Sequence, residues 1–187
     1  MPSFNEFTFL SSNGKNNVFV RECVPDGTIR GVVQIAHGIA EHSGRYVPFM
    51  EFLAENGFVA AADDHLGHGR TVADESEFCY FAPKNGWDLV VEDLDQLHRI
   101  EAAKYPDVPY FILGHSMGSF LARTYIIRHP EGLKGAIISG TGQNPGIVVS
   151  SGKLMAKLEI LDHGDKYPSP LLDKLAFGNY NKGYDKV

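Results

Sequence analysis

One serine of this sequence stands in a pattern that is typical of an activated nucleophile. Residues 114–118 read GHSMG, which places Ser116 between two glycines. The apolar residues 109–113 predict a buried strand before the motif, and residues 119–128 have a helical pattern that ends before Pro130. A serine at such a turn exposes its Oγ at a helix N-terminus, where backbone N–H groups favour negative charge. The chemistry expected of Ser116 is nucleophilic attack on a carbonyl group.

The two glycines of this motif have a steric reason. The serine of a strand–turn–helix junction takes a strained backbone conformation, usually with a positive φ, and the strand and helix backbones pass close to each other. The residues two before and two after it, Gly114 and Gly118, must therefore be small. The letters alone leave one alternative open, which is a glycine-rich turn before an ordinary helix.

Acyl transfer also needs backbone donors that stabilise an oxyanion. The dipeptide HG at residues 37–38 directly follows an apolar strand predicted for residues 31–36. Where a serine stands on such a turn, one donor comes from the loop after that strand and the other from the residue after the nucleophile. The pattern therefore selects the backbone N–H groups of Ile39 and Met117. A plain turn at residues 37–39 is the alternative.

The elements that must position these groups alternate along the chain. A hairpin comes first, and strands and helices then follow each other, which predicts an α/β fold with a mostly parallel sheet and helices on both faces. The expected strands are 7–10, 18–23, 31–36, 58–62, 109–113 and 135–138, and the expected helices are 46–55, 88–104 and 119–128.

The composition shifts in the last quarter of the chain. Residues 141–151 are small and polar, and residues 153–161 are amphipathic. No further apolar strand follows. We interpret residues 1–140 as the N-terminal part of the core, with six strands, and residues 141–187 as the start of a cap inserted into it.

The composition bounds the class of protein. The chain has 187 residues, of which 43% are hydrophobic and 21% are charged, values typical of a globular domain with a sizeable core. Its net charge of −6 argues against a nucleic-acid partner. No apolar stretch predicts a transmembrane helix, and the N-terminus does not look like a signal peptide. Two isolated cysteines favour a reducing compartment, so we expect a cytoplasmic protein without metal or other cofactor.

Three motifs taken together carry a resemblance to a known family. Residues 37–46 read HGIAEHSGRY, residues 64–70 read DHLGHGR, and residues 114–118 read GHSMG. In this order, each at a predicted strand end, they are similar to the signatures of the monoacylglycerol lipase and lysophospholipase group of α/β-hydrolases. This group shares a broad family with the serine aminopeptidases, and the similarity runs from about residue 7 to residue 140.

The resemblance implies an α/β-hydrolase fold and a serine carboxylic-ester hydrolase. Ser116 would be the nucleophile, and Ile39 and Met117 would supply the oxyanion donors, with a lipid-like monoacylglycerol or lysophospholipid as substrate. The alternatives are an aminopeptidase or small-molecule carboxylesterase on the same fold, and a non-catalytic binding protein without a complete triad. Apolar residues of the expected cap would line an acyl pocket or simply bury the cap: Leu154, Met155, Leu158, Leu161, Leu171, Leu172 and Leu175.

Two further groups of polar residues have competing interpretations. Glu41 and Arg45 stand four apart and would pair to hold the loop that carries Ile39, or would form a solvated ion pair. His65 and His68, with the aspartates at 63–64, suggest a metal cluster, but a structural loop is favoured because they lie in a glycine-rich stretch.

A base for the serine is not evident. In this fold the partners follow in the order Ser, Asp or Glu, His, so we expect both beyond Val187. His129 lies at the far end of the predicted helix 119–128, and His163 lies in the expected cap, so both are poor substitutes for the missing base. We therefore expect weak activity from the 187 residues alone and an exposed edge at strand 135–138. The chain would be a fragment of a longer product, the ordered part of one, or a partner of a separate C-terminal piece.

Overall fold

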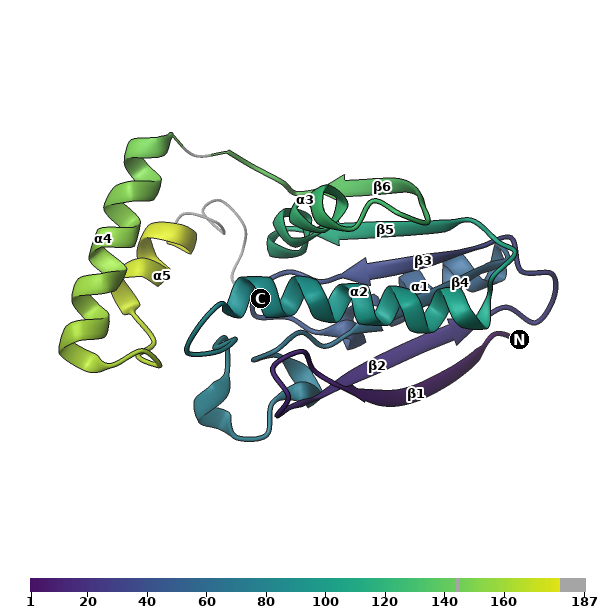
Figure 1. Cartoon of the computed structure of the whole chain (residues 1–187), viewed down its shortest axis with the longest axis horizontal. Helices are drawn as coiled ribbons and strands as arrows, with labels where there is room; N and C mark the ends of the chain where they lie inside the picture. Colours follow the sequence, from purple (N-terminus) through teal and green to yellow (C-terminus); the bar gives the residue numbers. More distant parts are fainter. Residues whose placement is uncertain (144, 179–187) are drawn as a thin grey trace. The chain divides into compact units, whose positions relative to one another are not determined.

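The computed structural model describes residues 1–143 and 145–178 of the chain. The chain divides into two compact units, Met1–Thr141 and Gly142–Val187, and each unit has its own set of elements (Figure 1). Among the described residues, the first unit contains the sheet and three α-helices, and the second contains two α-helices.

The first unit is built on a six-stranded sheet with the strand order β1-β2-β4-β3-β5-β6. The first two strands form an antiparallel hairpin, and β2 pairs antiparallel with β4, whereas the other neighbours are parallel. The mostly parallel sheet predicted from the sequence is therefore confirmed. The strands are β1 Ser3–Leu10, β2 Asn17–Val24, β3 Gly31–Ala36, β4 Phe58–Asp63, β5 Tyr110–His115 and β6 Leu133–Ser139.

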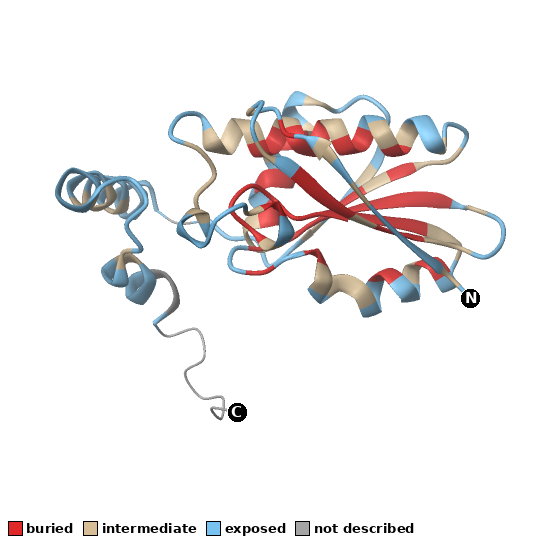
Figure 2. Cartoon of the chain, turned by 90° about the horizontal axis from the view of Figure 1, so that it is seen from below, coloured by how far each residue is buried: buried red, intermediate tan, exposed pale blue. Residues whose placement is uncertain are grey.

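Helices cover both faces of this sheet, as predicted. Helix α1 packs on one face, and helices α2 and α3 pack on the other, so that the buried strands lie between the two layers (Figures 1 and 2). The bounds are α1 Val47–Glu55, α2 Gly86–Lys104 and α3 Met117–Arg128, with short 3-10 helices η1 Ser43–Tyr46, η2 Gly69–Thr71 and η3 Glu75–Glu77.

Two apolar layers hold the sheet between its helices. Every residue of β3 is buried, which is typical of a central parallel strand covered on both faces. Its alternate residues Val33 and Ile35 pack with Met50 of α1, while Ala36 on the opposite face joins a cluster with Leu94 of α2. The carboxyl ends of β4, β3 and β5 consequently meet at one edge of a rigid sheet.

The last strand of the sheet has one unpaired edge in the part of the chain that the structure describes. Strand β6 ends the strand order and is hydrogen-bonded to β5 alone. None of its residues is buried, and the Ile137 side chain is half exposed. The exposed apolar edge predicted for this strand is confirmed.

The second unit begins with a helix that is longer than the sequence pattern indicated. Helix α4 runs over Gly146–His163, so residues 146–151 are helical and not part of a polar connection. Pro145 stands at the N-cap, where its missing N–H has no helical partner to lose, and the apolar residues 147–149 extend the helix from there. Helix α5 spans Pro170–Phe177 and is capped by Ser169, whose Oγ accepts from the Leu172 N–H at 3.0 Å.

None of the helices in the described ranges has the length and apolarity needed to cross a lipid bilayer.

Candidate active site

Ser116 occupies a strained turn between β5 and α3. Its φ of 51° and ψ of −118° are rare for a residue with a side chain, and it forms the N-cap of α3. The turn is held on both sides, because the Ser116 N–H donates to the Ser139 carbonyl at 3.0 Å and the Ser116 carbonyl accepts from the Ser119 Oγ at 2.6 Å. This is the local geometry expected of a serine presented at a helix N-terminus.

The two glycines of the motif are required by close backbone contacts. A Cβ on Gly114 would lie 2.3 Å from the Gly118 carbonyl oxygen, and a Cβ on Gly118 would lie 1.9 Å from the Ala36 carbonyl oxygen. Both neighbours are backbone atoms, which cannot move aside without displacing β3 or α3. The steric reason given for the motif therefore holds, and an ordinary glycine-rich turn does not describe it.

The loop after β3 passes directly beside this serine. A Cβ on Gly38 would lie 3.1 Å from the Ser116 Cβ, so the two segments are in close approach. Ile39 follows with 40% of its surface exposed, and Met117 is the half-buried first residue of α3. The structure thus brings the three residues singled out from the sequence to one edge of the sheet.

Glu41 fixes the shape of this loop from within. Its Oε1 accepts from the Gly38 N–H at 2.5 Å and from the Tyr46 hydroxyl at 2.8 Å, and its Oε2 lies 3.0 Å from Arg45 Nη1. The Glu41 side chain is 7% exposed, whereas that of Arg45 is 69% exposed. The predicted pair is present, and its carboxylate is a buried acceptor for the loop, whereas its guanidinium is exposed to solvent.

Two buried histidines, His37 and His65, contact each other at the base of the same loop. His37 Nδ1 contacts the Gly38 carbonyl oxygen at 2.7 Å, and its Nε2 accepts from the His65 N–H at 3.1 Å. The His65 Nδ1 lies 2.7 Å from Asp63 Oδ2, and both side chains are fully buried. The His37 and His65 rings stack with centroids 3.9 Å apart. Because a carbonyl oxygen can only accept, His37 carries its proton on Nδ1.

The environment sets the charge of these rings in opposite directions. Burial, with the neighbouring His65, holds the pKa of His37 well below its usual range. Burial also disfavours the charged form of His65, but the Asp63 carboxylate outweighs it and raises the pKa of His65. The His37 ring is therefore neutral, which its two hydrogen bonds require.

Asp64 ties the loop after β4 to the loop after β3. Its Oδ1 accepts from the Ser43 N–H at 2.7 Å, and its Oδ2 accepts from the Arg70 N–H at 2.8 Å. Most polar side-chain atoms of residues 63–68 are thus engaged with backbone and with one another, which matches the interpretation as a structural loop. Among the described residues, Asp63 Oδ1 and His65 Nε2 are buried without a hydrogen-bond partner. Sequence reasoning did not identify Asp64 or Tyr46 as loop ties, since their partners lie elsewhere in the chain.

One group of side chains in the described ranges has the spacing of metal ligands. Glu92 and Asp95 of α2 and His129 after α3 offer ligand atoms within 4.8 Å of one another. Arg99 forms an ion pair with Asp95, and His129 Nε2 is hydrogen-bonded to Glu92 at 3.1 Å, so these contacts already engage the group. Sequence reasoning did not single out this group.

His129 does not lie where a base for Ser116 is needed. The two residues stand at opposite ends of the 12-residue helix α3, which is about 18 Å long. The ring of His129 faces the carboxylates of α2 instead.

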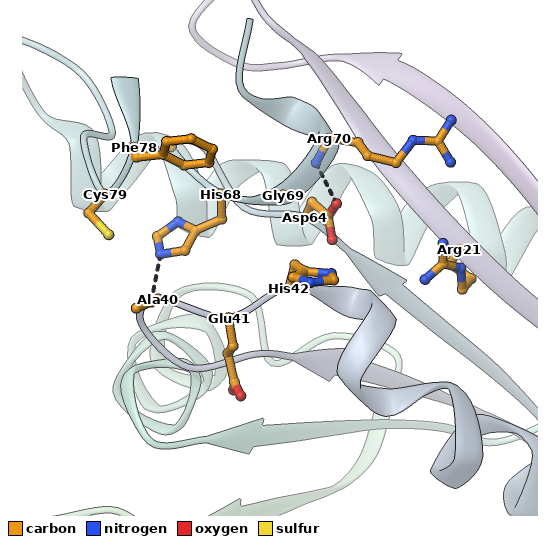
Figure 3. A pocket seen from close by; sticks show the side chains of 11 residues that line it. Arg21, Ala40, Glu41, His42, Asp64, His68, Gly69, Arg70, Phe78 and Cys79 are labelled. Carbon is orange, nitrogen blue, oxygen red and sulfur yellow. Dashed lines mark hydrogen bonds between the residues drawn. The ribbon is translucent and has the colours of Figure 1, made fainter. Parts of the chain in front are cut away.

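A pocket of about 580 Å³ is lined in part by residues 40–42 of the loop after β3 (Figure 3). Ala40 and His68 face each other at one wall, and Arg70 and Arg21 lie towards the strands (Figure 3). It is lined by Arg21, Ala40, Glu41, His42, Asp64, Gly67, His68, Gly69, Arg70, Phe78 and Cys79. A ligand in this pocket would contact the loop that carries Ile39.

The sheet order, the strained serine turn and the adjoining loop define an α/β-hydrolase. A sequence profile of the family described as "Serine aminopeptidase, S33" matches residues 27–163, and the chain belongs to this family. The chain is 35% identical over 145 residues to a monoacylglycerol lipase of Mycolicibacterium smegmatis. This match covers 72% of this chain and 48% of the lipase. The chain is 31% identical over 121 residues to a monoglyceride lipase of Rattus norvegicus, covering 65% and 38% of the two chains.

Solved structures show the same likeness. A thermostable carboxyl esterase from Bacillus coagulans, in complex with glycerol, superposes with a TM-score of 0.85 at 36% identity. The match covers 99% of this chain and 60% of the esterase. The chain therefore spans about half the length of the monoacylglycerol lipase and three fifths of the esterase.

Proposed function

We propose that the chain is the N-terminal part of a serine carboxylic-ester hydrolase that works through an acyl-enzyme on Ser116. The observation that carries the proposal is the strained Ser116 turn at the start of α3, with the Gly38 backbone in close approach to its side chain. A side chain in such a conformation costs folding stability, and strained residues of this kind cluster at functional sites. The family and the lipase and esterase relatives support the same reaction class.

In the proposed reaction, Ser116 Oγ attacks the ester carbonyl carbon and loses its proton to a base. The N–H groups of Ile39 and Met117 donate to the oxyanion, and loss of such a donor costs about 3–4 kcal/mol of barrier. The alcohol then leaves with a proton, and water hydrolyses the acyl-enzyme. Since His129 points elsewhere, we propose that the base and its acid come from beyond Val187 or from a separate C-terminal piece.

We further propose that the substrate is a lipid-like ester such as a monoacylglycerol or lysophospholipid. The names of the relatives and the exposed apolar side chains of α4 and α5 support this class, and residues 141–187 would be the first part of a cap. An aminopeptidase or a small-molecule carboxylesterase remains the second candidate, because the matching family is named for a peptidase and a solved relative is a carboxyl esterase. The mechanism invokes no cofactor. The cytoplasmic location and the absence of a nucleic-acid partner stay predictions.

The test is covalent capture by a fluorophosphonate probe, which requires an activated serine. The native gene product, with its mass measured intact, should be labelled at Ser116, and S116A should not be labelled. Ser150→Ala, an exposed serine of α4, is the matched control and should label like wild type. The 187 residues alone should react on the order of a million-fold more slowly, as expected for a serine without its histidine.

Each other outcome contradicts a stated part of the proposal. No labelling of the native product would favour the non-catalytic alternative. Full labelling of a chain shown to end at Val187 would overturn the placement of the base. A substrate panel separates the substrate classes, because a lipase should prefer long-chain monoacylglycerols or lysophospholipids to short esters and aminoacyl amides.

A further inference from the structure

Three consecutive peptide groups around Ile39 are each held by a different side chain. The Gly38 N–H donates to Glu41, and the Gly38 carbonyl oxygen contacts His37 Nδ1. The Ala40 N–H donates to His68 Nε2 at 3.3 Å, the contact drawn in Figure 3. A peptide group is planar, so its N–H and C=O point in fixed opposite directions. Fixing the groups on both sides of Ile39 therefore aims the Ile39 N–H itself.

His68 differs from the other two holding residues because it comes from another loop. Glu41 and His37 belong to the loop after β3, whereas His68 follows β4 and bridges 28 positions of sequence to Ala40. Ala40 has a φ of 56°, a conformation that needs an external tie to persist. The contact with His68 supplies such a tie at the residue after Ile39.

The loop that carries His68 is itself rigid. The His68 Nδ1 lies 3.0 Å from the Leu66 carbonyl oxygen, which can only accept a hydrogen bond. The proton of the His68 ring is therefore on Nδ1, and Nε2 is left to accept from the Ala40 N–H. Gly67 has a φ of 73°, and a Cβ there would lie 2.6 Å from the Tyr80 backbone oxygen. The ring is 2% exposed and lies 5.9 Å from the Phe81 ring.

We propose that His68 is a positioning residue for the proposed oxyanion donor, the Ile39 N–H. The neutral Nδ1–H tautomer of His68 holds the Ala40 amide and thereby orients the Ile39 N–H. This inference rests on the proposed function for its catalytic meaning, although the tie itself does not. When a solvent proton binds Nε2, the acceptor becomes a donor that faces another donor, and the tie is lost.

Burial favours the neutral form of the His68 ring and so keeps the tie intact at neutral pH. Burial lowers the pKa of His68, and the neighbouring His65 acts in the same direction, whereas Asp64 and Asp63 oppose it. The His37 ring lies 5.2 Å away between centroids, and its own pKa is held well below its usual range. The remaining charged or titratable residues that line the pocket with His68 are Arg21, Glu41, His42, Arg70 and Cys79.

The experiment follows the Ala40 and Ile39 amides by NMR in the 187-residue protein from pH 8 to pH 4.5. In the wild type, ring nitrogen shifts should show the Nδ1–H tautomer of His68, and the Ala40 amide signal should titrate with this ring below its usual pKa. His68→Gln supplies an acceptor that does not titrate, so Ala40 should stay protected from exchange at all these pH values. His68→Leu should exchange Ala40 about tenfold faster, as expected for one lost hydrogen bond. His163→Gln is the control, and this exposed histidine should leave Ala40 unchanged.

The wild type alone can overturn the proposal, either if the Ala40 amide signal does not change while His68 titrates or if His68 is found as the Nε2–H tautomer. Equal protection of Ala40 in His68→Leu overturns it as well. Probe labelling of Ser116 in the native product separates the two hypotheses. If the amide results hold and no variant is labelled, the tie stands and the proposed function fails. Protonation of the proposed base lowers labelling at acid pH in every variant, so the readout is the difference between variants. If labelling falls more steeply towards acid pH in wild type than in His68→Gln, both hypotheses stand.

Discussion

Two helices of similar length show how differently the two units use apolar residues. Helix α2 has 19 residues, and helix α4 has 18. Within the described ranges, α4 buries no residue, although it carries exposed apolar side chains at Ile147, Leu154, Leu158 and Leu161. Helix α2 buries eight: Val90, Val91, Asp93, Leu94, Asp95, Leu97, His98 and Glu101.

The difference teaches that a hydrophobic pattern predicts a face but not its partner. The apolar face of α2 packs against side chains of the central strands, including Ile112 of β5. In the described part of their own unit, the apolar residues of α4 have no comparable sheet to pack against. We therefore expect the first unit to respond sharply to substitution and the second to respond weakly.

The largest contrast should come from two glycine substitutions. Gly118→Ala places a Cβ against the Ala36 carbonyl oxygen and should lower the free energy of unfolding by about 4 kcal/mol, since backbone must move. Gly152→Ala in α4 has no atom within 4 Å and should stabilise its helix by about 0.5–1 kcal/mol. Urea unfolding followed by circular dichroism measures the first, and amide exchange within α4 measures the second. Equal effects at the two sites would remove the contrast between the units.

A smaller contrast should come from two leucines. Leu94→Ala empties a fully buried site and should cost about 3 kcal/mol of unfolding free energy. Leu158→Ala changes a side chain that is 59% exposed and should cost less than about 0.5 kcal/mol. The same denaturation experiment compares them. A large loss for Leu158→Ala would reveal a partner for α4 that its own unit does not provide.

The third contrast concerns buried charge. Lys104 Nζ lies 2.8 Å from Glu101 and 3.1 Å from Glu22, which places two acids and one base at the end of α2. Burial, with Glu22 beside it, raises the pKa of Glu101 from 4.5 to about 7. For Glu22, burial acts against ionisation, but hydrogen bonds, with Glu101 first among them, outweigh it and lower its pKa.

These directions separate two pH windows. Because folded Glu101 keeps its proton up to about pH 7 and the unfolded chain loses it near 4.5, the free energy of unfolding should fall as pH rises between these values. The contribution of Glu22 runs the other way and is lost only in more acid solution. Glu101→Gln should remove a fall of about 2 kcal/mol between pH 5 and 8. Asp173→Asn, an exposed carboxylate of α5, is the control and should keep the wild-type profile.

The sequence predicted most of the frame because its signals are local. Strand periodicity, the GHSMG turn and the stop at Pro130 lie within a few residues of the features they specify. The hydrogen bonds of Ala40 with His68 and of Ser43 with Asp64 were not predictable in the same way. Each joins the loop after β3 to the loop after β4, and only the pairing of these two strands brings the loops together. The start of α4 was predicted too late because the apolar residues 147–149 were grouped with the small and polar residues around them, and Pro145 was not recognised as a helix start.

The conformation of Ser116 also has a consequence for the evolution of this chain. A backbone at φ 51° and ψ −118° is cheap for glycine alone, and any side chain there costs on the order of 1–3 kcal/mol. Selection for folding stability by itself would favour glycine at this position. Under the proposed function, the serine at this position costs folding stability in exchange for reactivity, and a lineage without that reaction would gain stability from a single substitution to glycine.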